Sequence, residues 1–239
     1  MINVINTRPL FYRGRLKSDN KICFFDIPSI SIEPNEENLT KFNYNKIIFT
    51  SQIAVEYAKN NKILKKINGK FFAVGSATRD YAKKYLKSVS TTSSDGIDSL
   101  LDSTPFLNSK NEEILVVQGK KNNKELSKKI ERLGAKLYFY EPYKREFPDI
   151  SYKKKLNEIL ESIDVDFMIV SSKLNLENIM TMTYKRNQKK ILQIKIISTH
   201  SNLVGYIMQQ GFKEVYLNDG FKKIKENILL IYGKSREKR

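Results

Sequence analysis

Tyr143 is the side chain in this sequence whose surroundings most favour chemistry. It stands in the segment EPYKREFP (141–148), after Pro142 and before the cations Lys144 and Arg145. A phenol can donate a proton to a leaving hydroxyl group, and neighbouring positive charge stabilises the phenolate that remains. A tyrosine in such a segment can also be a linker residue whose half-buried ring only packs. The local sequence leaves both roles open.

Small hydroxyl side chains follow four apolar runs, at the points where a helical pattern begins. They are Thr50 with Ser51, Ser76 with Thr78, Ser171 with Ser172, and Thr199 with Ser201. A single residue of this kind is explained as a helix N-cap, whose oxygen accepts a hydrogen bond from a backbone amide. Because the carboxyl ends of parallel strands lie on one side of a sheet, four such places also predict helix N-termini that bind anionic groups. Gly75, just before Ser76, allows close backbone approach there.

The sequence contains few other groups that could catalyse a reaction. Its single cysteine, Cys23, lies in an apolar run and is predicted to be a small buried hydrophobe. The single histidine, His200, is predicted to stand in a loop or at a helix start. No carboxylate pair has metal-ligand spacing, and neither the dinucleotide fingerprint nor the phosphate-loop pattern occurs. We therefore expect no metal, and neither ATP nor NAD as ligand.

The chain has 239 residues, with 43 Lys and Arg against 26 Asp and Glu, which gives a formal charge of +17. This charge would attract a polyanion such as a nucleic acid, a membrane surface or a multiply carboxylated metabolite. Solvated helix faces explain it equally well. The basic residues are spread along the chain without a stacking-aromatic motif, which argues against nucleic acid. With no apolar run of about 18 residues and no basic leader, we expect a cytoplasmic protein without membrane contact.

Short apolar runs alternate with longer helical patterns throughout, which predicts parallel sheets built from βα units. The expected strands are residues 2–6, 21–27, 46–50, 70–75, 113–119, 136–140, 165–170, 194–198 and 214–217. Apolar residues at three- and four-residue spacing predict helices that include 51–61, 76–87 and 122–135. The last helix is expected to begin at Asp219, with Phe221, Ile224, Ile228 and Ile231 on its inner face.

A faint internal duplication organises these elements. The resembling pairs are 47–58 with 167–179, 71–82 with 194–207, and 4–10 with 115–123. In the first two pairs an apolar strand runs into hydroxyl residues that open a helix. Taken in order, the N-terminal unit belongs with the C-terminal units, and the middle units form their own set.

This permuted order predicts a discontinuous domain. We expect one α/β lobe from residues 1–34 plus 149–239, and an inserted α/β lobe from 35–148. The chain would cross between the lobes near 26–35 and 140–149, two segments that hold four of the six prolines. Proline favours an extended chain and removes a hydrogen-bond donor, so both segments are predicted to be extended linkers at a sheet edge. A ligand is expected in the cleft between the lobes.

Six segments carry a further pattern: NTRPL, IIFTSQIAV, FFAVGSAT, SSDGIDSLL, ILVVQGKKNNKELSKKIERLGAKLYFYEPYKRE and IISTHSNLVGYIMQQGF. In their order and spacing they resemble the uroporphyrinogen-III synthases. The resemblance implies an α/β fold of two flavodoxin-like lobes with parallel sheets, joined by a two-stranded extended linker, with the active site in the interlobe cleft. The chain departs from the family at Asn20, where glycine is frequent, and at 170–175 (VSSKLN), where Ser-Gly or Ser-Pro is common. These departures concern local loop shapes.

The resemblance also implies an activity, that of a carbon–oxygen lyase of haem biosynthesis. Such an enzyme closes the linear tetrapyrrole hydroxymethylbilane with loss of water. It inverts the last pyrrole ring through a spiro intermediate, which gives uroporphyrinogen III without a cofactor. Tyr143 would match the tyrosine of the family's Tyr-x-Arg stretch, which helps the substrate hydroxyl leave. The expected substrate-binding residues are Thr7, Arg8, Thr50, Ser51, Gly75, Ser76, Thr78, Ser171, Ser172 and Thr199.

The expected partner is therefore a small polycarboxylate, bound by a monomer that takes no nucleic acid. Arg8 and either Lys144 or Arg145 are the cations expected nearest to it. One alternative is a two-lobed module of the periplasmic type that binds an anion without catalysis. The absence of an export signal argues against this alternative, and turnover of hydroxymethylbilane would distinguish the two.

Overall fold

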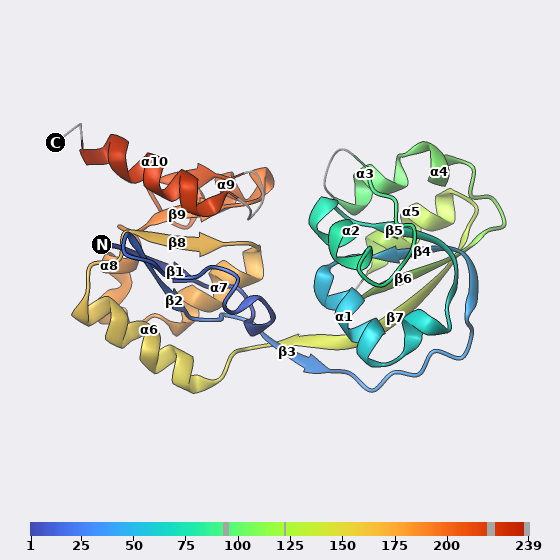
Figure 1. Ribbon diagram of the computed structural model, residues 1–239, viewed down its shortest axis with the longest axis horizontal. Coiled ribbons are helices and arrows are strands. Elements are labelled where there is room, and N and C mark those ends of the chain that lie inside the picture. Colours follow the sequence, from blue (N-terminus) through green and yellow to red (C-terminus); the bar gives the residue numbers. More distant parts are fainter. Residues whose placement is uncertain (93–95, 122, 219–222, 237–239) are drawn as a thin grey trace. The chain divides into compact units, whose positions relative to one another are not determined.

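The computed structural model of this chain describes residues 1–92, 96–121, 123–218 and 223–236 (Figure 1). Contacts between residues divide the chain into two compact units. Unit 1 is Met1–Ile32 with Glu146–Arg239, and unit 2 is Glu33–Arg145. Within the described ranges, no helix combines the length and apolar character that crossing a membrane would require.

Unit 1 is built around a five-stranded sheet. Its strands are β1 (Ile2–Asn6), β2 (Ile22–Asp26), β8 (Phe167–Val170), β9 (Lys195–Ser198) and β10 (Val215–Leu217). They are hydrogen-bonded in the order β2-β1-β8-β9-β10, and each neighbouring pair is parallel. Numbered by their succession within the unit, the strands lie in the order 2-1-3-4-5. This is the strand order of flavodoxin-like folds.

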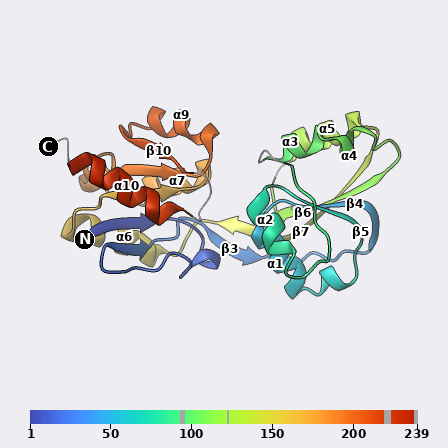
Figure 2. The same ribbon diagram turned by 45° about the horizontal axis from the view of Figure 1, so that its top comes forward.

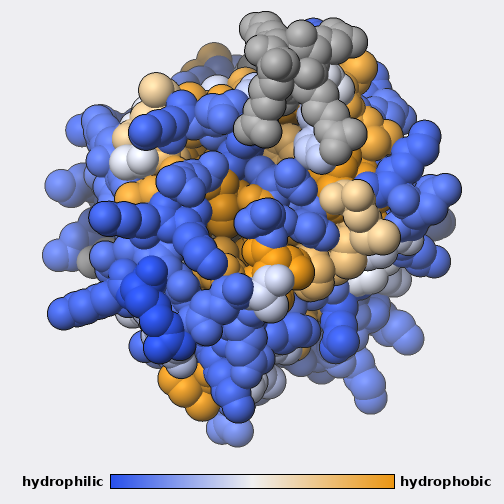
Figure 3. Space-filling model, turned by 90° about the vertical axis from the view of Figure 1, so that its left-hand side faces the viewer, coloured by the Kyte–Doolittle hydropathy of each residue, from blue (hydrophilic) through white to orange (hydrophobic). Residues whose placement is uncertain are grey.

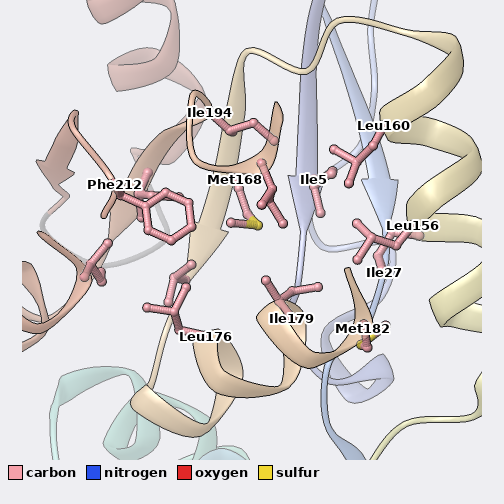
Figure 4. Packing of buried hydrophobic residues seen from close by; sticks show 14 of the residues in the cluster. Ile5, Ile27, Leu156, Leu160, Met168, Leu176, Ile179, Met182, Ile194 and Phe212 are labelled. Carbon is pink, nitrogen blue, oxygen red and sulfur yellow. The ribbon is translucent and has the colours of Figure 1, made fainter. Parts of the chain in front are cut away.

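Helices cover both faces of this sheet. They are η1 (Leu10–Tyr12), α6 (Ile150–Ser162), α7 (Lys173–Met182), η3 (Lys185–Asn187), α8 (Gln188–Ile191), α9 (Ser201–Gln209) and α10 (Ile224–Arg236). Met168 of β8 packs with Leu156 of α6 and Ile179 of α7 in the cluster of Figure 4. The next residue, Ile169, packs in another cluster with Ile228 of α10, the red helix of Figure 2. Successive side chains of a strand point to opposite faces, so β8 is apolar throughout because both faces are covered.

The inner face expected for the last helix is confirmed where the structure describes it. Ile224 and Ile228 are buried, and Ile231 packs partly buried against the same cluster. Asp219, the expected start of that helix, and Phe221 lie outside the described residues.

On the face of the molecule shown in Figure 3, hydrophilic residues cover most of the surface and hydrophobic ones appear between them.

A second five-stranded sheet lies in unit 2, apart from the first two residues of β3 and the last residue of β7, which belong to unit 1. Its strands are β3 (Ser31–Pro34), β4 (Asn43–Phe49), β5 (Asn68–Ala73), β6 (Glu113–Gly119) and β7 (Lys136–Glu146). They lie in the order β3-β7-β6-β4-β5, and β7, β6, β4 and β5 pair in parallel. The helices of the unit are α1 (Gln52–Asn60), η2 (Ile63–Lys65), α2 (Ser76–Ala82), α3 (Ile97–Leu101), α4 (Thr104–Leu107) and α5 (Lys124–Arg132). Ile48, Phe72, Val116 and Ile130 belong to its core.

The two sheets confirm the internal duplication. The order β7-β6-β4-β5 in unit 2 repeats the order β2-β1-β8-β9 in unit 1 once the permutation is applied. An isolated parallel bridge joins Phe72 of β5 to Ser90, at the edge where β10 follows β9 in unit 1. The helices after β4 and β8 also begin alike, because Ser51 has φ −161° and ψ 163°, and Ser172 has φ −162° and ψ 163°.

The chain passes between the units through strands β3 and β7, which are neighbours in one sheet. Pro34 ends β3, an edge strand, and Pro142 lies within β7. The carbonyl oxygen of Pro142 accepts a hydrogen bond from the backbone amide of Asn35 at 3.0 Å. The proline-containing segments are thus extended and hydrogen-bonded to each other.

The length of one helix and the burial of Cys23 differ from the prediction. The helix expected over 76–87 ends at Ala82, and turn hydrogen bonds continue to Leu86, whose amide donates to the carbonyl oxygen of Ala82 at 3.0 Å. Cys23 is half-buried and not fully buried. The reason is its position on β2, the edge strand of the unit 1 sheet, where no further strand covers one side.

Candidate functional site

The Tyr143 side chain lies near the end of β7 and is 0% exposed. Its hydroxyl oxygen is 3.0 Å from Oγ of Ser51, in a contact where either oxygen can donate. The same oxygen accepts a hydrogen bond from Nη2 of Arg145 at 3.3 Å. The Tyr57 ring packs beside it, with ring centroids 5.3 Å apart. The phenol is therefore held in place by a hydroxyl group, a cation and an aromatic neighbour.

Ser51 links this phenol to a helix N-terminus. It is the N-cap of α1, and its Oγ accepts a hydrogen bond from the backbone amide of Ala54 at 3.1 Å. The capping role expected for Ser51 is thus confirmed, and the same oxygen also contacts Tyr143. The N-terminus of a helix carries a partial positive charge, which favours negative charge nearby. The preceding residue, Thr50, uses its hydroxyl to donate to the carbonyl oxygen of Val117 at 3.3 Å, between β4 and β6.

The two cations expected beside Tyr143 have different positions. Arg145 is exposed, and its guanidinium carbon lies 5.5 Å from the centroid of the Tyr143 ring. Lys144 is half-buried on the same strand, where neighbouring side chains point to opposite faces. Lys121 lies near Arg145: its partial burial, and then the like charge of Arg145, lower the pKa of Lys121, while Glu141 opposes the shift. Positive charge thus gathers close to the phenol of Tyr143.

Gly75, Ser76 and Thr78 form the start of α2. Gly75 precedes the helix with φ +88°, a left-handed conformation that favours glycine. The helix begins at Ser76, so Ser76 and Thr78 are not its N-cap, and capping is the wrong explanation for both. Ser76 is exposed and Thr78 is buried.

Gln118 was not predicted from the sequence, yet it is buried at the end of β6. Its Nε2 donates to Oε1 of Glu141 at 2.8 Å, which fixes the orientation of the amide because a carboxylate only accepts. Among the described residues, no group donates to the buried Oε1 of Gln118. Glu141 also accepts from Nδ2 of Asn123 at 3.2 Å. Gln118 and Asn123 thus hold the carboxylate of Glu141, which precedes Pro142 and Tyr143 on β7.

In unit 1, Asn175 joins several strand ends, and sequence reasoning missed it. Its Oδ1 accepts hydrogen bonds from the backbone amide and from Oγ of Ser171, both at 3.1 Å, and lies 2.9 Å from Oγ1 of Thr7. Its Nδ2 donates to the carbonyl oxygen of Thr7 at 2.9 Å and to Oγ of Ser29. The hydroxyl of Thr7 also donates to the carbonyl oxygen of Ile169 at 2.6 Å. The hydroxyl groups of Thr7 and Ser171 therefore have partners inside the unit.

Ser172 is the N-cap of α7, as expected, and its Oγ accepts from the amide of Asn175 at 3.1 Å. The pattern Ser-x-x-Asn is close to a capping box, and this spacing is the signal that could have identified Asn175. Thr199 follows β9 and precedes His200, the exposed residue before α9. Within the described part of the chain, Oγ1 of Thr199 is buried and has no hydrogen-bond partner.

Arg8 follows the end of β1 and is 7% exposed. Its guanidinium carbon lies 3.7 Å from the centroid of the Tyr12 ring, and Arg15 stacks over the same ring at 4.8 Å. Burial lowers the pKa of Arg8 to about 10, with an opposing contribution from Tyr12 and a further lowering by Arg15. Arg8 is still protonated at neutral pH, so unit 1 presents a cluster of two arginines and an aromatic ring. Only Arg8 of this cluster was predicted.

The phenol of Tyr143 could transfer a proton, and the cations and helix N-termini described above could bind carboxylates. Over the described ranges, no three His, Cys, Asp or Glu side chains come together as metal ligands would. The cleft expected between two lobes stays a prediction.

Comparison with known proteins gives a family and a fold. The family model described as uroporphyrinogen-III synthase HemD matches residues 22–222. Among solved structures, the uroporphyrinogen-III synthetase from Helicobacter pylori 26695 has a TM-score of 0.66 at 14% identity, over 97% of this chain and 100% of that chain. A mutant uroporphyrinogen III synthase from Thermus thermophilus has a TM-score of 0.63 at 14% identity, over 100% of both chains. At such identity the likeness shows the fold.

The search of curated proteins gave no significant match. The family match spans most of the chain, and it includes the strands and helices that hold Tyr143, Ser51 and Ser172. The α/β fold with two parallel sheets agrees with it. This chain therefore belongs to the uroporphyrinogen-III synthase family.

Proposed function

We propose that Tyr143 is the general acid with which this chain carries out the reaction of its family, the closure of hydroxymethylbilane to uroporphyrinogen III. One observation carries the proposal: the Tyr143 hydroxyl lies between Oγ of Ser51 and the guanidinium of Arg145. A phenol that gives up its proton leaves a phenolate, which needs hydrogen-bond donors. Arg145 always donates, and the Ser51 hydroxyl can rotate to donate while its oxygen still caps α1.

The first step is loss of water. The phenol of Tyr143 passes its proton to the hydroxyl of the hydroxymethyl group, the carbon–oxygen bond breaks, and water leaves. The ring that carried the group becomes an electron-poor azafulvenium cation, which keeps its N–H proton. Arg145 and Ser51 stabilise the phenolate that stays behind.

The later steps depend on the position of the substrate. The last pyrrole attacks through its substituted carbon, which forms the spiro intermediate. That intermediate fragments and closes again with the ring inverted, and the proton released when the pyrrole regains aromaticity can return to the Tyr143 phenolate. Catalysis of this kind comes from positioning, with acid help at the leaving oxygen.

The fully buried phenol must become accessible before it can act. Arg145 is the neighbour that can move, because its side chain is exposed and long. A substrate carboxylate attracts this guanidinium and shifts it only far enough for the substrate hydroxyl to approach Tyr143, so that Arg145 can still donate to the phenolate. Substrate binding and access to the acid are then linked.

The substrate carries an acetate and a propionate on each pyrrole, so it is a polyanion. Arg8, the helix N-termini at Ser51 and Ser172, and the start of α2 at Gly75 supply positive charge or backbone amides for these groups. Thr50, Ser76, Thr78 and Thr199 are proposed as further contacts. Thr7 and Ser171 are proposed as contacts too, with hydroxyl groups that exchange their partners inside unit 1 for the substrate.

The proposal also includes the division of the chain into lobes, its oligomeric state and its location. The lobes are residues 1–34 plus 149–239 and residues 35–148, which the division of contacts supports. The enzyme acts as a monomer in the cytoplasm, without nucleic acid, and substrate binds between the lobes. An anion-binding module without catalysis is the alternative.

Fresh hydroxymethylbilane tests the function directly. Unaided ring closure gives the uninverted type I isomer, so the protein should speed consumption of the substrate and yield type III. The two isomers are separated and measured with and without protein. Type I product alone, at the rate of the buffer control, would refute the proposed activity. Tight binding of the substrate without turnover would then favour the anion-binding module.

A further inference from the structure

Gly119 ends β6 and is paired in register with Tyr143 on β7. A Cβ placed on Gly119 would lie 2.5 Å from Cε2 and 2.8 Å from Cζ of the Tyr143 ring, and 3.1 Å from Nη1 of Arg145. Carbon atoms in contact are normally about 3.5–4.0 Å apart. The phenol ring therefore rests on the backbone of Gly119, in space that any side chain would fill.

The backbone itself does not require glycine here. Gly75 and Gly134 have φ values of +88° and +71°, whereas the φ of Gly119 is outside this left-handed region. An alanine could adopt the backbone conformation of Gly119 without strain. The need for glycine comes from the two side chains that lie over it, Tyr143 and Arg145.

We propose that Gly119 is a positioning residue for the acid: the missing side chain sets the place of the Tyr143 hydroxyl and of the Arg145 guanidinium. This inference rests on the proposed function of Tyr143. An added methyl group forces the ring to move by about 1 Å to regain normal contact. The 3.0 Å contact with Ser51 and the 3.3 Å hydrogen bond from Arg145 then lose their geometry. A displacement of this size at a reacting group can lower the rate by about 10²-fold.

Gly119→Ala is the variant that tests this role. It should lower kcat for formation of type III isomer by about 10²-fold and let type I product accumulate. Gly205→Ala is the matched control: Gly205 lies in α9, and a Cβ there meets no described atom within 4 Å. Gly205→Ala should keep the wild-type rate and isomer ratio.

A double-mutant cycle separates positioning from a general loss of structure. In a Tyr143→Phe background the hydroxyl is gone, so Gly119→Ala should change kcat by less than about threefold. The ring is still present, so the same substitution should lower the urea midpoint as much as it does in the wild type. A full additional 10²-fold loss of kcat in the Tyr143→Phe background would overturn the proposal, because Gly119 would then act through something other than the phenol.

A second cycle keeps the test decisive if Gly119→Ala does not fold. Tyr143→Ala removes the ring, so Gly119→Ala/Tyr143→Ala should unfold at the same urea midpoint as Tyr143→Ala alone. An equal loss of midpoint with and without the ring would refute the contact. This cycle does not depend on turnover. If the wild-type protein fails to cyclise hydroxymethylbilane, the proposed function is refuted, but the unfolding data still test the contact between the Tyr143 ring and the backbone of Gly119.

Discussion

Replacing Tyr143 with phenylalanine removes one oxygen atom from a buried ring and keeps the packing of that ring. The ring remains beside Tyr57 and above Gly119. Ser51 keeps its hydrogen bond from the amide of Ala54, and the exposed Arg145 can turn to water. The variant therefore loses a hydrogen-bonding hydroxyl whose former partners find other partners. The free energy of unfolding should fall by about 1 kcal/mol or less.

The loss for catalysis should be larger. A positioned general acid contributes about 10²–10⁴-fold to the rate. We expect the lower limit for Tyr143→Phe, since hydroxymethylbilane already loses its hydroxyl unaided and much of the barrier reduction comes from positioning. A 10²-fold decrease corresponds to about 2.7 kcal/mol of activation free energy. The expected effect on turnover therefore exceeds the expected effect on stability.

The assay measures both the rate and the product. Purified Tyr143→Phe is mixed with hydroxymethylbilane, and the type I and type III isomers are separated over time. Slow formation of type III lets spontaneous type I product accumulate, so the isomer ratio should shift along with the rate. Urea unfolding of the same sample controls for stability. Wild-type rate and isomer ratio in this variant would show that Tyr143 is only a packing residue.

Ser51→Ala removes the cap of α1 and a neighbour of the phenol, so it should lower the free energy of unfolding by about 1 kcal/mol and also lower kcat. A change in urea unfolding with unaltered kcat would contradict the role beside Tyr143. Asn175→Ala removes the acceptor of the Ser171 amide and hydroxyl, together with a donor to the Thr7 carbonyl oxygen, and we expect a loss of about 3 kcal/mol in urea unfolding. A loss below about 1 kcal/mol would contradict this account of unit 1. The Michaelis constant for hydroxymethylbilane should rise with ionic strength; a constant value from low to high salt would contradict charge-based binding.

Local patterns in the sequence predicted those parts of the fold and site that depend on neighbours along the chain. Apolar runs identified the strands other than β3, whose segment was predicted as an extended linker, and the hydroxyl residues that follow β4 and β8 identified the caps Ser51 and Ser172. The buried role of Asn175 was missed because a polar residue in a helical pattern is usually placed on the solvent side. The opposite face of α7 is covered by β1 and the segment after β2, which bring Thr7 and Ser29 to Asn175.

Contacts between residues on neighbouring strands could not be predicted from the sequence either. Gly119 and Tyr143 are 24 positions apart, and only the register of β6 and β7 places the ring over the glycine. The register shifts between Val117 and Gly119, so alternation along the two strands would not have given this contact. Arg15 was missed for a similar reason, since its position over the Tyr12 ring, which Arg8 also contacts, depends on the path of the loop after β1.

The duplicated fold lets the proposed roles of the two units be compared. Both present a helix N-terminus capped by a serine with nearly the same backbone angles, Ser51 and Ser172, and such a terminus suits an anion in either unit. The difference lies in the neighbouring strands. In unit 2 the backbone of Gly119 leaves room for the ring of Tyr143, whose hydroxyl then reaches the cap at Ser51. In unit 1 the side-chain amide of Asn175 bonds Ser171 and Thr7 and ties the strand ends to each other, and the cation predicted for this unit is the buried Arg8. In our proposal, acid catalysis belongs to unit 2 and carboxylate binding to both units, and exchanging these roles would take changes on two strands at once.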